Sequence, residues 1–362
     1  MLFDTLLLSF FALASVGGAA PTGREELGKR QAPAGVPDYV LKYAPLIYLH
    51  SSEQYFPTDL SSFLANTVPK NPSFQPTPNA PSPVTLNNVN QLPSDTYLTS
   101  KDEISENPAA AWLKGTKPDS NGKTQGAVPA AVIVADKGDG VVDAFYMFFY
   151  AYNYGGNVLR IKQLNFGNHV GDFEHLMIRF RNGAPEYVWY SQHANGQAFS
   201  YGTVRKQGLR PLAYSANGSH ANYAIPGKHD HTIPNFNLPA GALEDDTDAG
   251  ILWDPIQSAY WYQYSFDRNG DRNAGSFTAY DSASPTEWLE FRGRWGDQEY
   301  PTSDKRQAKL FGQAKFGSGP TGPKDKQLGR SNVCPDNGNK CILRTILVPR
   351  RVGDEEDQVQ GM

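Results

Sequence analysis

Short apolar, β-prone runs separated by turn residues fill the middle of the chain, at 130–135, 141–152, 176–180, 186–191, 199–201 and 210–215. Lys-Gly-Asp-Gly at 137–140 joins the first two runs, and Arg-Asn-Gly at 181–183 joins the next two, which predicts two β-hairpins. Asn195-Gly196 predicts a further turn. Short runs at regular spacing indicate two antiparallel sheets packed as a sandwich.

The pattern is less regular on either side of this region. We expect a first strand around 43–50, a Pro- and Asn-rich surface loop over 68–94, one helical turn at 109–113 and a closing strand at 286–295. The run 249–264 fits either a strand or a helix. The sequence therefore predicts a mostly β protein, an antiparallel β-sandwich with long irregular loops and a few short helices.

Composition supports this fold class and excludes some partners. Charged residues make up 19% of the 362 residues, while Gly, Pro, Tyr and Phe are abundant, as expected for a β-rich globular protein with many turns. The net charge of -4 excludes a broad basic footprint, so nucleic acid is not an expected partner. We expect no transmembrane span in the mature chain, because no later apolar run approaches the ~20 residues that a bilayer requires.

The N-terminal segment has the features of a secretory signal. An apolar run over 6–16 leads into small residues at 17–20, although Asp4 stands where a basic residue is usual. We therefore expect a signal peptide over 1–20 and a propeptide over 21–30 ending at Lys29-Arg30, a pair that resembles the site cut by kexin-type proteases. The mature chain would hold one domain over 31–350 and a disordered acidic tail over 351–362.

The two cysteines agree with a secretory route. Cys334 and Cys341 have C-x6-C spacing with turn residues between them, which indicates a local disulfide in an oxidising compartment. The sequon Asn217-Gly218-Ser219 is the one N-x-[ST] match that proline does not block. It adjoins His220 in a motif that we expect to be buried, so we do not expect it to be used.

Two histidines and two acids lie within the eight residues 168–175, at the start of a predicted strand. The period of two puts Asp172 and Glu174 on the face that continues into Leu176, Ile178 and Phe180. Carboxylates at the head of an apolar face are costly to bury unless a cation or several donors meet them. H-x-x-D-x-E, with His169, is thus the best metal-site candidate, and solvated acids at a strand end are the alternative.

His193 and His220 are the other candidate site residues. His193 follows the partner strand of the second hairpin, so the predicted register brings it close to His169, Asp172 and Glu174. His220 is a candidate metal ligand or general base, and otherwise a loop histidine bonded to backbone. We interpret His229 and His231 as solvated loop histidines. The acidic run 245–248 fits a hard-cation site and a capped turn equally well.

At these residues the chain resembles the Vps62 family, a group linked to vacuolar protein sorting. The resemblance covers most of the mature chain, in order, at the motifs Tyr43-Ala44-Pro45, His169 to His175, Ser191-Gln192-His193, Ser215 to Ala221, Asp246-Thr247, Trp253-Asp254, Phe291 to Asp297 and Gly319 to Pro323. Phe173 replaces the tryptophan expected in the family's G-D-W-E. This resemblance implies a sorting role and no particular chemistry.

A more distant resemblance is to the necrosis- and ethylene-inducing secreted proteins, through their G-H-R-H-D-W-E heptad. It places His169, Asp172 and Glu174 on that family's metal-site positions and His193 on its later histidine. The second central histidine becomes Gly171, and Asn153 is a loose counterpart of an upstream metal-binding aspartate. That family is a β-sandwich that uses a divalent cation to engage sphingolipid headgroups, so the resemblance implies similar chemistry here.

Three functional hypotheses follow. The first is a secretory-pathway protein, extracellular or vacuolar, that binds Ca²⁺ or Mg²⁺ at His169, Asp172, Glu174 and His193 and through it a membrane lipid headgroup or glycan. The second is a metal-dependent hydrolase of a phosphodiester or glycan, with His193 or His220 as general base. The third is a sorting factor whose histidines are only structural.

Overall fold

The computed structural model describes residues 32–105, 109–161, 164–230, 243–266, 271, 274–310 and 312–348. The described residues belong to one compact unit. The predicted signal peptide, propeptide and acidic tail, like His231, lie outside the described residues. Helical segments are short: α1 Asp38–Lys42, α2 Leu60–Ala65, α3 Glu287–Glu290 and the 3₁₀ turns η1 Val89–Gln91, η2 Ala111–Lys114, η3 Val158–Arg160, η5 Pro255–Gln257 and η6 Pro323–Lys326.

An eight-stranded sheet forms the centre of the fold, in the order β16–β15–β4–β5–β6–β7–β8–β19. Both predicted hairpins are present, as antiparallel β4/β5 and β6/β7, while β15 joins β4 in parallel. The strands are β4 Ala130–Gly138, β5 Val141–Asn153, β6 His169–Arg181, β7 Ala184–Gln192, β8 Asn195–Ser200, β15 Ala259–Ser265, β16 Ser276–Ala279 and β19 Leu343–Arg344.

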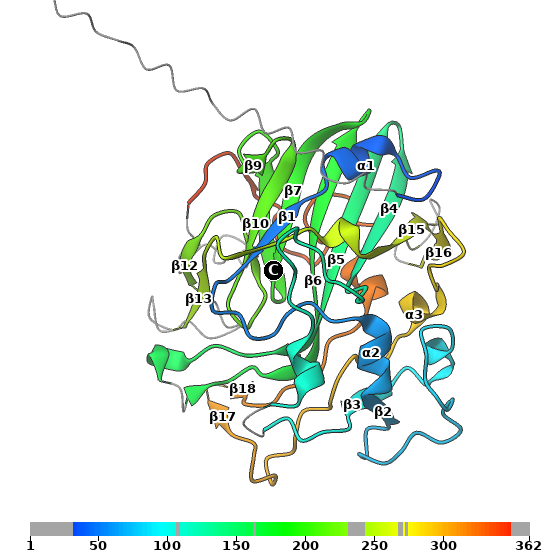
Figure 1. Cartoon of the computed structure of the whole chain (residues 1–362), viewed down its shortest axis with the longest axis vertical. Helices are drawn as coiled ribbons and strands as arrows, with labels where there is room; N and C mark the ends of the chain where they lie inside the picture. Colours follow the sequence, from blue (N-terminus) through cyan, green and yellow to red (C-terminus); the bar gives the residue numbers. More distant parts are fainter. Residues whose placement is uncertain are drawn as a thin grey trace, which may run out of the picture. The chain divides into compact units, whose positions relative to one another are not determined.

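A second sheet packs over one face of the first and completes the β-sandwich. Its order is β11–β10–β1–β14, with β9 paired to β10 and β1 parallel to β10. Side chains from both sheets share one core, and Figure 1 shows β1 and β10 lying over the long strands of the main sheet. The strands are β1 Leu46–Leu49, β9 Lys206–Gln207, β10 Arg210–Ser215, β11 Asn222–Tyr223 and β14 Ile251–Trp253.

The opposite face of the main sheet is covered by short helices and irregular segments instead of a sheet. Phe149 and Phe173 on this face both pack against Trp295, and Phe173 also stacks on Trp288. The strand face assignment from the sequence is confirmed, because Leu176, Ile178 and Phe180 face the second sheet. Smaller two-stranded sheets complete the fold: β2 Thr67–Lys70 with β3 Tyr97–Ser100, β12 Gly227–Asp230 with β13 Glu244–Thr247, and β17 Lys309–Leu310 with β18 Gln313–Ala314.

Several local predictions were wrong. The turn expected at Asn195-Gly196 lies two residues earlier, because Gln192 pairs with Asn195 and His193 takes the positive φ of +56° that a two-residue loop requires. Gly196 belongs to β8, where a Cβ would lie 2.4 Å from the Trp189 ring. A tight β7/β8 hairpin therefore places His193 at its tip.

The closing strand predicted over 286–295 is the short helix α3 followed by irregular chain. Trp288 of the helix and Phe291 and Trp295 of the irregular chain are all buried. The loop predicted over 68–94 contains the end of β2 and η1, and 249–264 resolves into β14, η5 and β15. His229 is also not solvated: it is 1% exposed on β12 and stacks on Tyr223.

The predicted disulfide between Cys334 and Cys341 is present. Within the described ranges, none of the helices has the length and apolarity needed to cross a bilayer. Asn217 of the sequon is exposed, although Gly218, Ser219 and His220 beside it are buried. The expectation of burial was therefore wrong for the asparagine itself.

Candidate functional site

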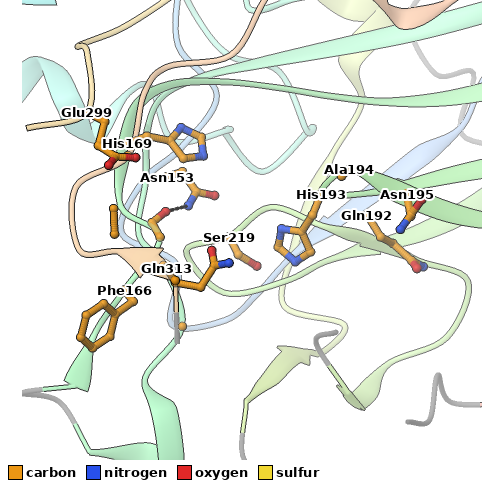
Figure 2. Close-up of a pocket in the computed structure, with 16 residues that line it drawn as sticks. Asn153, Phe166, His169, Gln192, His193, Ala194, Asn195, Ser219, Glu299 and Gln313 are labelled. Carbon is orange, nitrogen blue, oxygen red and sulfur yellow. Dashed lines mark hydrogen bonds between the residues drawn. The ribbon is translucent and has the colours of Figure 1, made fainter. Parts of the chain in front are cut away.

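A polar cleft of about 310 Å³ opens at the His169 end of β6. The β7/β8 hairpin tip contributes His193, and the segment before β11 contributes Ser219. In the view of Figure 2, Asn153, Ser219 and Gln313 lie between His169 and His193. The cleft is lined by Asn153, Gly155, Gly156, Phe166, Gly167, His169, Gln192, His193, Ala194, Asn195, Ser219, Glu299, Gly312, Gln313, Ala314 and Gly317.

The two acids of the H-x-x-D-x-E motif are buried beside this cleft rather than lining it. Asp172 and Glu174 pair with Tyr150 and Phe148 of β5 on the face that the second sheet covers. Their residues are 6% and 3% exposed. Alternation along β6 thus buries both carboxyl groups between the two sheets, as the sequence predicted for their shared face.

His220 lies between Asp172 and the neighbouring loop that contains Tyr55. Its Nδ1 lies 3.0 Å from a carboxylate oxygen of Asp172, and its Nε2 lies 2.9 Å from the carbonyl oxygen of Tyr55. Burial alone would lower the pKa of His220, but the hydrogen bond to Asp172 and the charge of Glu53 raise it above its usual value, which favours the imidazolium. The ring is fully buried and stacks on Tyr150 at 3.8 Å.

A third carboxylate completes this arrangement. Glu53 accepts hydrogen bonds from the backbone amides of Tyr55 and Gly218, both at 2.8 Å. Its carboxylate also lies 3.9 Å from Nε2 of His220. Two buried carboxyl groups, of Glu53 and Asp172, therefore lie against the ring of His220.

The environments of Asp172 and Glu174 move their pKa values in opposite directions. Burial alone would raise the pKa of Asp172, but its hydrogen bond to His220 and the nearby His169 lower it below the usual range. Burial, and then the charge of Asp172, raise the pKa of Glu174 well above the usual range. Glu174 interacts with the Ser191 hydroxyl and accepts from the His193 amide at 3.2 Å. Asp172 is thus the charged member of the pair.

His169 is a neutral imidazole at the cleft wall. Its Nδ1 lies 2.7 Å from the Gly171 carbonyl oxygen, so this nitrogen carries the hydrogen and Nε2 keeps its lone pair. Burial lowers the pKa of His169, which favours the neutral ring. Gly171 has φ of +69°, and a Cβ there would lie 1.9 Å from the Trp295 carbonyl oxygen, so no larger residue fits.

The His193 ring turns away from Glu174 toward a different acid. Asp245 accepts hydrogen bonds from Nε2 of His193 at 2.8 Å, the Ser219 hydroxyl at 2.6 Å and the Tyr223 hydroxyl at 2.7 Å. Asp245 is 4% exposed, whereas a quarter of the His193 side chain is accessible from the cleft. Asp245 orients His193 and Ser219 at the cleft surface.

The structure assembles the predicted residues in two groups. His169 and His193 line the cleft, whereas Asp172, Glu174 and His220 are buried behind it. Motif reading missed Glu53 entirely and gave Asp245 only as part of an acidic run. His175 of the same motif points to the other face, where its ring lies 3.5 Å from Arg330.

A cation site does not follow from side chains alone. In the part of the chain that the structure describes, no three His, Cys, Asp or Glu side chains are grouped so that they could hold a metal ion. The imidazolium of His220 stands where the acids were expected to need a cation. Asn153, the loose counterpart of a metal-binding aspartate, donates from its amide to the Gly167 carbonyl at 2.9 Å.

Comparison with known proteins gives a family match over most of the chain. Residues 33–330 match the family described as Vacuolar protein sorting-associated protein 62. Vacuolar protein sorting-associated protein 62 of Saccharomyces cerevisiae is 35% identical over 326 residues, covering 83% of this chain and 68% of its own. TDA6, another protein of that yeast named for vacuolar protein sorting, is 36% identical over 335 residues, with coverages of 83% and 69%.

Two solved structures also match, at low similarity. Necrosis and Ethylene inducing Protein 2, from the causal agent of cocoa's witches' broom disease, is 13% identical with a TM-score of 0.27, covering 58% of this chain and 74% of its own. NLPPya in complex with glucosamine is 10% identical with a TM-score of 0.29, covering 64% and 77%. Scores this low carry no argument about fold or ligand.

Proposed function

This chain belongs to the Vps62 family of vacuolar protein sorting-associated proteins, and from that premise we propose that it is a secretory-pathway protein whose cleft beside His169 binds a lipid headgroup or glycan. The observation that carries the proposal is the chemistry of the cleft wall. Side-chain amides, a hydroxyl and two oriented imidazoles face one concave space of about 310 Å³. Convergent polar groups in a pocket of this size are typical of small-ligand sites.

A divalent cation, Ca²⁺ or Mg²⁺, is the second component of the proposal. Such cations need few protein ligands when the bound molecule supplies oxygens: Mg²⁺ keeps several waters and takes one or two carboxylates plus substrate phosphates. His169 offers a lone pair at Nε2, and Asp172 is a charged carboxylate behind it. We therefore expect the cation to bind together with an anionic headgroup and not by itself.

Calorimetry tests this coupling. Mg²⁺ or Ca²⁺ is titrated into the chain from Gln31 onward, alone and with inositol 1-phosphate as an anionic headgroup probe or methyl mannoside as a neutral glycan probe. We expect cation binding only with the phosphate probe. His169→Gln and Asp172→Asn should weaken it about 10- to 100-fold, as loss of groups supporting metal sites does.

His50→Gln is the matched control, because His50 is a half-buried histidine bonded to the Ser52 amide outside the cleft. It should leave binding unchanged. If neither probe binds with or without a cation, the proposal fails and the histidines are structural. Binding of methyl mannoside with no effect of cation would keep the glycan half of the proposal and remove the metal.

A metal-dependent hydrolase is the second candidate. The observation in its favour is the pKa split of Asp172 and Glu174, since two carboxyl groups with diverging pKa values are the usual acid and base of such sites. Of the two candidate general bases, His193 is favoured, because its side chain is a quarter accessible from the cleft whereas His220 is fully buried. Turnover of phosphodiester or glycan substrates that chelation abolishes would favour this function over binding alone.

A further inference from the structure

A second cleft, of about 590 Å³, holds three tyrosines and several asparagines. The Tyr55 and Tyr154 rings are stacked, with centroids 6.1 Å apart and planes 12° apart, and Tyr152 lies 5.0 Å from Tyr55. Asn157 and Asn217 line the same cleft. Aromatic rings beside side-chain amides indicate a cleft that fits a ligand with both apolar and polar faces.

Asn217 stands at the edge of this cleft and is the sequon asparagine. Its side chain is exposed, while its backbone is fixed: the Asn217 amide donates to the Asp246 carbonyl at 3.0 Å. The next residue, Gly218, has φ of +77° and lies against Tyr154, since a Cβ there would be 3.0 Å from the tyrosine Cβ. The loop thus holds the one unblocked N-x-[ST] asparagine of the chain next to the stacked tyrosines.

A sugar fits the chemistry of this cleft. A pyranose ring has an apolar face that packs on aromatic rings, and its hydroxyl and acetamido groups form hydrogen bonds with polar side chains such as the amides that line this cleft. The Cys334–Cys341 disulfide agrees with the proposed secretory route, along which N-glycosylation occurs. An exposed asparagine and an aromatic platform for the first sugar occur together.

We propose that Asn217 carries an N-linked glycan and that its first N-acetylglucosamine lies in this cleft on Tyr55 and Tyr154. In the attachment step the Asn217 side-chain nitrogen forms a bond to C1 of the sugar and loses a proton. The bond from C1 to the diphosphate of a lipid-linked oligosaccharide breaks, and the lipid diphosphate leaves. This inference rests on the secretory route and not on headgroup binding at His169.

Site occupancy is the first test. The full chain is secreted from yeast and digested with peptide N-glycosidase F, which converts a glycosylated asparagine into aspartate. We expect loss of one glycan and an aspartate at 217 by peptide mass spectrometry. Asn217→Gln should abolish the glycan, whereas Ser219→Thr should keep it, because threonine preserves both the sequon and a hydroxyl for Asp245. An unmodified Asn217 in the secreted protein overturns the proposal.

The position of the first sugar needs a second test. The rate of native deglycosylation is compared between wild type, Tyr154→Ala and Tyr48→Ala. Tyr48 is the control, because it is a half-buried tyrosine stacked on Tyr214 at the same interplanar angle of 12° but outside the cleft. We expect Tyr154→Ala to be digested about three to ten times faster, the change that loss of one aromatic contact produces, with Tyr48→Ala unchanged.

Equal rates in all three proteins would overturn the placement in the cleft. If Tyr154→Ala does not fold, Tyr55→Leu serves as the second variant, since it removes the other ring of the stack and keeps an apolar side chain. Headgroup binding is measured on Asn217→Gln in parallel. Its retention in that variant separates a failure of the glycan proposal from a failure of the His169 cleft.

Discussion

The two ends of strand β6 bury acidic groups in opposite ways. At the Arg181 end, Asp143 is fully buried, and Arg179 donates two hydrogen bonds to it, at 2.7 and 2.8 Å. The same guanidinium donates to the Ser331 and Asn332 carbonyls, so its hydrogens are also used. At the His169 end, the carboxylates of Asp172 and Glu53 lie 3.0 and 3.9 Å from the two ring nitrogens of His220. Glu174 instead interacts with the Ser191 hydroxyl and the His193 amide.

The difference separates a structural ion pair from a candidate functional site. A bidentate guanidinium neutralises one carboxylate, and the Lys137 ammonium also lies 3.5 Å from Asp143. At the His169 end, burial and then the charge of Asp172 raise the pKa of Glu174, although Lys326 acts to lower it. A buried carboxyl group with a raised pKa, next to a polar cleft, is a candidate for binding a cation or exchanging a proton.

The largest expected effect on stability comes from removing the buried acid at the Arg181 end of β6. Asp143→Ala leaves the Arg179 charge buried without its partner, which we expect to lower the free energy of unfolding by about 3–5 kcal/mol. Glu186→Ala is the control, because its partner Arg181 is half exposed, and exposed pairs contribute about 0–1 kcal/mol. Urea denaturation of the two variants measures both values. Similar small losses of unfolding free energy in the two variants would show that the Arg179–Asp143 ion pair does not stabilise the fold.

Sequence reasoning found the elements whose information is local. The hairpins β4/β5 and β6/β7 carry their turn residues and their alternation within about 25 residues, and the shared face of Asp172 and Glu174 follows from the period of two. The Cys334–Cys341 bridge is equally local. Each of these predictions needed no knowledge of what packs against the strand.

The partners of the acids are not local, and that is why they were missed. His220 meets the Tyr55 carbonyl, and Gly218 meets Glu53, each across 165 residues of chain. No spacing rule in a single sequence connects such positions. The position of the turn at His193 was predicted wrongly for a different reason. Asn195-Gly196 is a strong turn signal, but Gly196 lies in the strand because a side chain there would clash with Trp189.

A pH titration extends the comparison to another acid near the His169 end, Asp297. It follows Gly296, which packs against Val170 of β6, and its side chain accepts hydrogen bonds from the Ser100 amide and the Tyr300 hydroxyl. Burial raises its pKa to about 6. The folded state therefore holds this proton more tightly than the unfolded chain does.

Stability should consequently fall as pH rises from about 4 to above 6. Two pKa units correspond to about 3 kcal/mol for this group. Asp297→Asn keeps an acceptor for the Ser100 amide and removes the titrating group. The unfolding free energy of this variant should therefore fall less than that of the wild type between about pH 4 and pH 6. Denaturation curves at intervals of pH measure the difference between the two proteins. An unchanged slope in the variant would mean that Asp297 is not a buried, proton-holding carboxyl.

The smallest expected effect tests whether the carboxyl group of Glu174 is uncharged in the folded protein. Because Glu174 holds a raised pKa, its neutral acid already resembles glutamine in shape and hydrogen bonding, and Glu174→Gln should change the unfolding free energy by about 0.5 kcal/mol or less at pH 7. Asp172→Asn, two residues away, removes a charged partner of His220 and should cost about 2 kcal/mol. Equal losses from both would make the two acids equivalent, and the His169 end would then be a second balanced ion cluster. A small loss at Glu174 beside a large one at Asp172 would mean that β6 buries one charge and one proton at this end, which leaves Glu174 able to release its proton when a cation arrives.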